Sequence, residues 1–219
     1  YTACILGTTF GNLNKVSRNK ARMAKYTYVI ASDESGLSHN IIDPSQAQSL
    51  IDAQAKYIET KGELIEIQGY LGVGPRAVAV QYLYTIEGAN IAGMQQVLSF
   101  PHAAVHTDPT AAFTPKFRVV YTPNFHPDIE GGQCILVDLH NHVTYVMGPD
   151  YFGESKKGAL RMLCASAYQN GGLVLHAGAK ELLLNGKRMT VAILGLSGTG
   201  KTTTTFSQQG DGVRPIQDD

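Results

Sequence analysis

Apolar residues recur at helical spacing between residues 44 and 61, which predicts an amphipathic helix. The positions that form its apolar stripe are Ala47, Leu50, Ile51, Ala55 and Ile58. Asp43 suits the N-cap, Pro44 suits the first turn, and Gly62 suits the residue after the end.

The rest of the pattern predicts a chain of mixed helices and strands. Two further helices are expected over residues 88–99 and 154–169. Short apolar, β-branched runs predict strands over 64–67, 77–84, 117–121, 173–175 and 190–194. Two hairpins are expected, one joining 134–139 to 143–147 and one joining 181–184 to 188–194 around Asn185-Gly186. Glycines at 69, 72 and 74 with Pro75 predict a turn-rich stretch. The fold class is therefore α/β with mixed sheets.

The apolar run Thr190–Leu194 is expected to be a buried strand that leads into a phosphate-binding loop. Gly195, Leu196, Ser197, Gly198, Thr199, Gly200, Lys201 and Thr202 fit the pattern G-x-x-x-x-G-K-[ST] in full. Glycines let backbone N–H groups turn inward around phosphate oxygens, and the N-terminus of a following helix favours an anion. Lys201 would reach the β- and γ-phosphates, and the Thr202 hydroxyl would ligate Mg²⁺. The alternative is a glycine-rich turn that matches by chance.

Threonines at 202–205 are poor helix formers, so the helix after the loop is expected to be short. The acidic pair Asp218-Asp219 follows downstream, where carboxylates commonly hold the metal of a phosphate loop. Without the loop, two aspartates of this kind are most simply a solvated turn.

Charge and cysteine content say little about the function of the chain. Lysine plus arginine and aspartate plus glutamate number 18 each, so no net field favours nucleic acid or a membrane surface. The three cysteines, Cys4, Cys134 and Cys164, show no CxxC spacing and no disulfide framework, which favours a reducing, cytoplasmic location. No apolar run approaches the length of a membrane span, and the start of the chain does not resemble a signal peptide.

We expect two domains, residues 1–171 on the substrate side and residues 172–219 as the beginning of a nucleotide-binding domain. A phosphate loop normally opens a domain, and the sequence stops soon after Lys201. We therefore expect most of that second domain to be missing and the 219-residue chain alone to be inactive.

Four elements in the second half of the chain resemble the ATP-dependent phosphoenolpyruvate carboxykinase family. The segment 151–157, Y-F-G-E-S-K-K, is similar to the family's Y-x-G-E-x-K-K. His176 follows a short apolar run, as the metal-binding histidine of the family does. The phosphate loop is identical to the ATP-type loop of the family, and Asp218-Asp219 match its acidic motif. The order of these elements agrees, whereas the first hundred residues show no such motif.

The resemblance implies roles for individual residues. Lys157, His176 and Asp219 would bind a transition metal, typically Mn²⁺, and Asp218 would order metal-bound water. Lys201 would steady the transferred phosphoryl group and Tyr151 would face the organic acid. A lysine ligates a metal only when it is neutral, and the metal together with Lys156 would lower its pKa. Taken alone, Lys156-Lys157 is a solvated helix face and His176 a core histidine.

One family motif has no good counterpart. The family's substrate arginine lies in a G-R-S-P-K-D-type segment, and the nearest stretch here, residues 74–78, lacks the serine, lysine and aspartate. Arg76 in that stretch would clamp a carboxylate. The difference leaves open a paralogue that acts on another small acid.

Three functions remain open. The first is conversion of oxaloacetate and ATP to phosphoenolpyruvate, carbon dioxide and ADP, with ATP, Mg²⁺ and Mn²⁺ as cofactors and no nucleic acid or membrane partner. The second is a kinase for another small molecule or a protein, and the third is a non-catalytic nucleotide-binding module. The histidine pairs 102 and 106, and 140 and 142, lack further zinc ligands and are interpreted as loop histidines.

Overall fold

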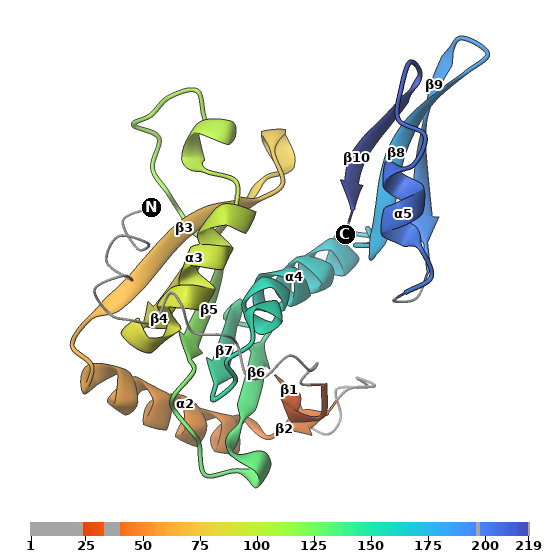
Figure 1. Ribbon diagram of the computed structural model, residues 1–219. Helices are drawn as coiled ribbons and strands as arrows, with labels where there is room; N and C mark the ends of the chain where they lie inside the picture. Colours follow the sequence, from red (N-terminus) through yellow and green to blue (C-terminus); the bar gives the residue numbers. More distant parts are fainter. Residues whose placement is uncertain (1–23, 33–39, 196–197, 219) are drawn as a thin grey trace. The chain divides into compact units, whose positions relative to one another are not determined.

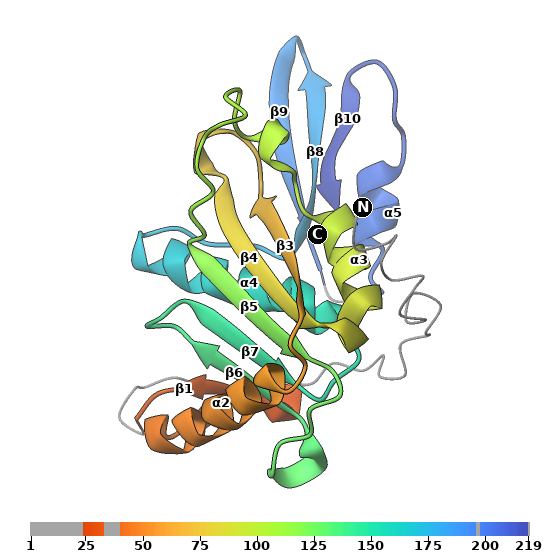
Figure 2. The same ribbon diagram turned by 90° about the vertical axis from the view of Figure 1, so that its left-hand side faces the viewer.

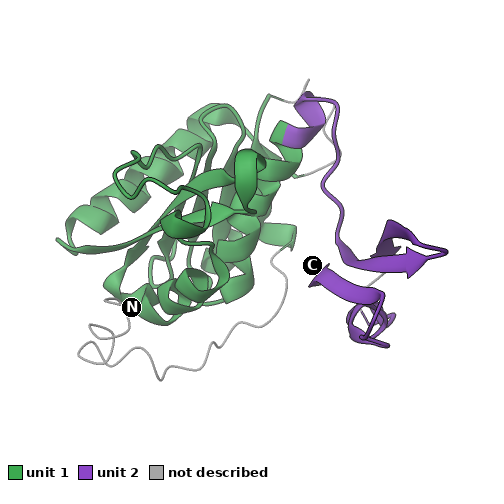
Figure 3. Ribbon diagram, turned by 90° about the horizontal axis from the view of Figure 1, so that it is seen from above, with its two compact units in different colours: residues 1–166 green, residues 167–219 purple. Residues whose placement is uncertain are grey.

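The computed structural model describes residues 24–32, 40–195 and 198–218 (Figure 1). The chain divides into two compact units, residues 1–166 and 167–219 (Figure 3). The predicted domain boundary at 171/172 stays a prediction.

The first unit is built on a seven-stranded mixed sheet with the order β2-β1-β6-β7-β5-β4-β3 (Figure 2). The strands are β1 Thr27–Ile30, β2 Ile41–Ile42, β3 Leu64–Leu71, β4 Val78–Thr85, β5 Phe117–Thr122, β6 Cys134–Asp138 and β7 Val143–Met147. The three adjacent strands β4, β5 and β7 run parallel, so their carboxyl ends share one edge. Strands β3 and β6 run antiparallel to their neighbours β4 and β7.

In the part of this unit that the structure describes, three helices cover the sheet, and short 3-10 turns join the elements. The helices are α2 Pro44–Glu59, α3 Ala89–Leu98 and α4 Phe152–Gln169. The turns are η1 Ala24–Tyr26, η3 Gly74–Arg76, η4 Ile86–Gly88, η5 His102–Ala104 and η6 Glu130–Gly132. Asp43 caps α2 because its side chain accepts a hydrogen bond from the Ser45 backbone N–H at 2.8 Å. Gly62 follows α2 in the left-handed region, with a φ of 73°, a conformation that glycine adopts without strain and that commonly ends helices.

The sheet has a hydrophobic core on each face, as the alternation of side chains along a strand requires. Helices α3 and α4 share one core with Val80, Tyr82 and Tyr84 of β4 and with the aromatic residues of β5. Helix α2 shares the other with Cys134 and Leu136 of β6. Because α4 begins just after β7 and packs on β5, the sheet fixes where the first turn of α4 lies.

The second unit is a small three-stranded sheet with one short helix. Its strands are β8 Ala177–Leu184, β9 Lys187–Leu194 and β10 Val213–Asp218, in the order β10-β8-β9, all antiparallel. Asn185 and Gly186 turn β8 into β9 with φ values of 51° and 74°, as a two-residue turn with both residues left-handed requires. Helix α5, Lys201–Phe206, is six residues long, so the prediction of a short helix is confirmed.

Most predicted elements are present, and the mixed α/β fold class is confirmed. Three predictions are wrong. Residues 173–175 form no strand, and Leu173 is 75% exposed, because no neighbouring strand offers this stretch a hydrogen-bonding ladder among the described residues. Strand β9 is not buried, and Leu194 is 63% exposed, because among the described residues the six-residue helix α5 is the one helix that packs on this small sheet. Gly69 belongs to β3 rather than to the turn, where its bare Cα admits the Ser99 side chain.

No helix among the described residues is long and apolar enough to cross a membrane.

Candidate active site

The motif at 151–157 includes the first turns of α4. Steric contact explains why its third residue, Gly153, is a glycine. The Tyr151 ring folds back over Gly153, so that a Cβ added at Gly153 would lie 2.5 Å from the Tyr151 Cε1 atom. Real Cβ atoms essentially never approach another heavy atom so closely. The Y-x-G spacing therefore lets the tyrosine ring pack closely against the helix that follows it.

A second tyrosine holds the backbone of this turn. The Tyr151 backbone N–H donates to the Tyr121 hydroxyl at 3.1 Å, and that hydroxyl donates to the Tyr151 carbonyl at 2.9 Å. Tyr121 is fully buried in β5, and burial raises its pKa well above the ordinary value. The side chain therefore remains a neutral phenol that both accepts and donates.

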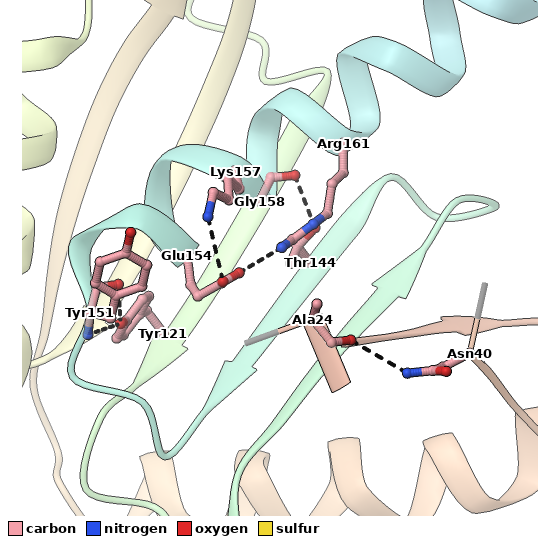
Figure 4. A network of polar contacts seen from close by, with 9 residues as sticks. All are labelled: Ala24, Asn40, Tyr121, Thr144, Tyr151, Glu154, Lys157, Gly158 and Arg161. Atoms are coloured by element: carbon pink, nitrogen blue, oxygen red, sulfur yellow. Dashed lines mark hydrogen bonds and ion pairs between the residues drawn. The ribbon is translucent and has the colours of Figure 1, made fainter. Parts of the chain in front are cut away.

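Glu154 lies at the centre of an ionic cluster on α4 (Figure 4). Its carboxyl group is fully buried and accepts a hydrogen bond of 2.6 Å from Arg161 Nη2. The Lys157 ammonium lies 4.0 Å from the other carboxylate oxygen and 5.4 Å from the centroid of the Tyr151 ring. The structure thus brings Tyr151 and Lys157 together, as the motif requires of residues that share one site.

Three more hydrogen bonds hold α4 in place, two to the sheet and one to α3. The Ser155 hydroxyl lies 2.7 Å from the Tyr84 hydroxyl and donates to Gln95 at 2.8 Å, entirely within the core. The Thr144 hydroxyl donates to the Gly158 carbonyl at 3.0 Å. These bonds hold the helix on both sides of Lys157, so the lysine projects from a rigid support.

Arg76 lies elsewhere in the same unit. It ends the η3 turn between β3 and β4 and is exposed. This turn precedes the amino end of β4, whereas Tyr151 contacts Tyr121 near the carboxyl ends of the parallel strands. The structure therefore does not bring Arg76 together with Tyr151.

The predicted phosphate-binding loop, residues 195–202, lies in the second unit, and its Leu196 and Ser197 are outside the described residues. Gly198 and Gly200 have φ values of 79° and 91°, in the region that glycine alone enters without strain. Lys201 Nζ donates to the Gly195 carbonyl at 2.9 Å, which closes the loop on itself. Thr202 is exposed at the start of α5.

Strand β8 anchors the helix that follows the loop. Thr205 of α5 is fully buried and lies so close to Gly178 that an added Cβ there would overlap the threonine hydroxyl. Lys180, only 9% exposed, donates from Nζ to the Thr204 carbonyl at 2.7 Å. The helix, and with it the loop, is therefore held on β8 by a close approach and a charged hydrogen bond.

Strand pairing places the remaining predicted residues at one edge of the small sheet. The first residues of β8 pair with Leu194 at the end of β9 and with Asp218 at the end of β10. His176 immediately precedes β8, and Gly195 immediately follows β9. His176, the phosphate loop and the backbone of Asp218 therefore share this edge, and Asp219 lies outside the described residues.

No three His, Cys, Asp or Glu side chains in the described parts of the chain lie close enough to hold a metal ion. The predicted ligand set is of another kind, since it contains a lysine and Asp219. His102 and His106, which stack with ring centroids 4.6 Å apart, direct their Nε2 atoms to the Ala111 carbonyl and to the Tyr70 hydroxyl. These histidines are bonded to the protein itself.

The sequence motifs did not identify the residues that support this site. Glu154 belongs to the motif but had no assigned role, and Arg161, Tyr121 and Lys180 gave no sequence signal. Arg161 stands seven residues after Glu154, which is two helical turns, and that spacing is the only hint in the sequence.

Comparison with known proteins extends the similarity beyond the four motifs. The model of the phosphoenolpyruvate carboxykinase family, ATP type, matches residues 8–219. The match therefore also covers residues 8–100, in which no motif stood out, because it draws on the whole sequence rather than on short segments.

Curated relatives carry the same name. The chain is 29% identical over 175 residues to a phosphoenolpyruvate carboxykinase (ATP) of Geobacillus kaustophilus, covering 77% of this chain and 31% of the relative. It is 39% identical over 94 residues to the enzyme of that name from Aeropyrum pernix, covering 39% of this chain and 19% of the relative. A glycosomal one from Trypanosoma cruzi is 35% identical over 78 residues, covering 35% of this chain and 16% of the relative.

The chain thus spans less than a third of the length of these relatives. The match to the family model, in contrast, runs over nearly all of its residues. The chain belongs to the ATP-type phosphoenolpyruvate carboxykinase family.

Proposed function

We propose that the whole protein converts oxaloacetate and ATP to phosphoenolpyruvate, carbon dioxide and ADP. Family membership supports this reaction. The observation that carries the proposal is the pairing of β8 with β9 and β10, which puts His176, the phosphate loop and the end of β10 at one sheet edge. The 219 residues alone are expected to be inactive, and a cytoplasmic location is part of the proposal.

ATP would be held by the phosphate loop. The backbone of residues 195–200 would surround the phosphates, and Ser197 within it would add a hydroxyl. Lys201 would exchange its present bond to the Gly195 carbonyl for the β- and γ-phosphates. The exposed Thr202 hydroxyl would hold the Mg²⁺ of the nucleotide.

A second metal ion would lie beside the phosphates, held by Lys157, His176 and Asp219, with Asp218 ordering a metal-bound water. The donor chemistry fits Mn²⁺, which accepts both nitrogen and carboxylate ligands. Such an ion would polarise the enolate oxygen that forms when oxaloacetate loses carbon dioxide. The carbon–carbon bond electrons become the enolate, whose oxygen bonds to the γ-phosphorus as the bond to ADP breaks.

Tyr151 would face the organic acid. Its ring is half-buried, its backbone is fixed by Tyr121, and its face lies beside Lys157. Arg76 was predicted to clamp a carboxylate, and that role stays a prediction. Its place at the far end of β4 favours a second candidate function, a kinase for a different small acid.

The test is turnover by the full-length protein. With ATP, Mg²⁺ and Mn²⁺ present, we expect oxaloacetate to yield phosphoenolpyruvate and ADP in equal amounts, and Lys201→Ala to abolish the reaction. Phosphate transfer to another acid, with none to the enolate of oxaloacetate, would support the second candidate. Tight ATP binding without any transfer would indicate a non-catalytic module.

A further inference from the structure

The Tyr121 hydroxyl holds the two peptide groups that flank one Cα atom. It accepts a hydrogen bond from the Tyr151 backbone N–H at 3.1 Å and donates to the Tyr151 carbonyl at 2.9 Å (Figure 4). These two groups belong to the planar peptide units on either side of the Tyr151 Cα, and the orientations of those planes define its φ and ψ. Because the backbone atoms fix where Cβ lies, the hydroxyl restrains the direction in which the Tyr151 side chain leaves the chain.

Helix α4 is anchored to the sheet without this hydroxyl. The helix begins at Phe152, so Tyr151 precedes it. One turn further on, the Ser155 hydroxyl lies 2.7 Å from the Tyr84 hydroxyl of β4, within the core. The Tyr121 hydroxyl therefore acts on the residue before the helix, and the contact does more than attach the helix to the sheet.

Tyr121 is a rigid support for this contact. Its side chain is fully buried, and its ring centroid lies 5.7 Å from that of Tyr84, its register partner on the neighbouring strand. A neutral hydroxyl donates and accepts through a single oxygen atom, which lets one side chain hold an N–H and a carbonyl of the same residue. Phenylalanine at this position would fill the same space and make neither bond.

The direction of the Tyr151 side chain decides where its ring lies. Gly153 leaves the space into which the ring folds back, and the ring centroid lies 5.4 Å from Lys157 Nζ. The side chain is half-buried, so part of it remains accessible to a ligand. A misplacement of about 1 Å in a group that contacts substrate can cost about a hundredfold in rate.

We propose that Tyr121 is a positioning residue, whose hydroxyl sets the direction of Tyr151 and thereby contributes to recognition of the organic acid. This inference rests on the proposed function, in which Tyr151 faces that acid. The residues that carry it all lie in the first unit, residues 1–166.

The test compares two tyrosine-to-phenylalanine variants of the full-length protein by steady-state kinetics, at a temperature at which every variant is folded. Tyr121→Phe keeps the ring in the core but removes both bonds to Tyr151. We expect KM for oxaloacetate to rise and kcat/KM for oxaloacetate to fall by up to about a hundredfold. KM for MgATP should stay unchanged, because neither tyrosine belongs to the proposed nucleotide site at residues 195–202.

Tyr84→Phe is the matched control. It also removes a buried hydroxyl contact to α4, but this contact is to Ser155 rather than to Tyr151. We expect both variants to lower the thermal midpoint, and Tyr84→Phe to leave KM for oxaloacetate unchanged. A loss of folded protein alone would lower the maximal rate and leave KM for both substrates as it was, so the KM values separate positioning from stability.

Tyr151→Ala shows whether Tyr121 acts through Tyr151. If it does, adding Tyr121→Phe to Tyr151→Ala should lower kcat/KM for oxaloacetate no further. A further fall in the double variant would overturn the inference. So would an unchanged KM for oxaloacetate in Tyr121→Phe, or an equal rise in Tyr84→Phe. If Tyr151→Ala itself keeps the kcat/KM of the unaltered protein, the proposed role of Tyr151 fails, and this inference fails with it.

Discussion

At the residue scale, the motif around Tyr151 is explained by contacts rather than by spacing alone. Gly153 leaves room for the Tyr151 ring, and the ring lies against the Lys157 ammonium. The sequence suggested Tyr151 and Lys157 through family resemblance, but it did not indicate that Glu154 would be fully buried between two cations. Whether a charged residue of a helix faces water or the core depends on the sheet beneath it, which no local pattern specifies.

Gly153→Ala should disturb the site without unfolding the protein. Alanine favours a helix over glycine by about 0.5–1 kcal/mol, but its methyl group would displace the Tyr151 ring. We expect a thermal midpoint near that of the unaltered protein, with kcat/KM for oxaloacetate lowered by up to about a hundredfold, the order that a 1 Å misplacement of a positioned group can cost. Gly210→Ala is the control, since a Cβ there meets open space. Equal activity of both variants would contradict the steric role of Gly153.

Cys134 should be unreactive in the folded protein. Burial in β6 raises the pKa of its thiol to about 12, so the thiolate that reacts with alkylating reagents is scarce at neutral pH. Mass spectrometry after iodoacetamide treatment at pH 8 should show modification at the exposed Cys164 and none at Cys134. Cys134 should react once urea unfolds the sheet. Rapid labelling of Cys134 without urea would contradict its place in the core.

At the element scale, the sequence predicted those helices and turns that residues close together in the chain specify. The cap and apolar stripe of α2 and the Asn185-Gly186 turn are encoded within a few residues, and both are observed. The strand order β2-β1-β6-β7-β5-β4-β3 is not encoded locally, because it depends on pairing between distant segments. Residues 173–175 show why a local signal can also mislead, since an apolar run becomes a strand only where another strand pairs with it.

The stability that the Asp43 cap gives to α2 should decrease in acid. Hydrogen bonds from the Ser45 hydroxyl and backbone N–H lower the pKa of Asp43 below its usual value. A depressed carboxyl pKa contributes stability that is fully present above the unfolded pKa and lost as pH falls through the folded one. Asp43→Ala should therefore lower the urea midpoint at pH 7, and the difference from the unaltered protein should shrink below about pH 4. A difference that grows in acid would contradict the cap.

Lys180 should matter for nucleotide binding through helix α5. Lys180→Met keeps the length of the side chain but removes the hydrogen bond to the Thr204 carbonyl. Loss of a charged hydrogen bond costs about 1.5–3 kcal/mol, so we expect lower stability and weaker MgATP binding by calorimetry. Lys187→Met, at an exposed position of β9, should leave both unchanged. Identical ATP affinity in the two variants would contradict the anchoring role.

At the scale of the whole molecule, the proposed metal site draws on both units. Lys157 lies in residues 1–166, whereas His176 and Asp219 lie in residues 167–219. Within the first unit, the sheet fixes the start of α4, and within the second, strand pairing gathers the predicted residues at one edge. The proposed metal site therefore needs Lys157 together with His176 and Asp219 as ligands of one ion.

Anomalous X-ray scattering from Mn²⁺ in crystals of the full-length protein with ATP tests this requirement most directly. We predict one manganese peak within bonding distance of Lys157 Nζ, a ring nitrogen of His176 and the Asp219 carboxylate, beside the phosphates held by the loop. Manganese bound elsewhere, with these three side chains in separate regions, would contradict the proposed active site.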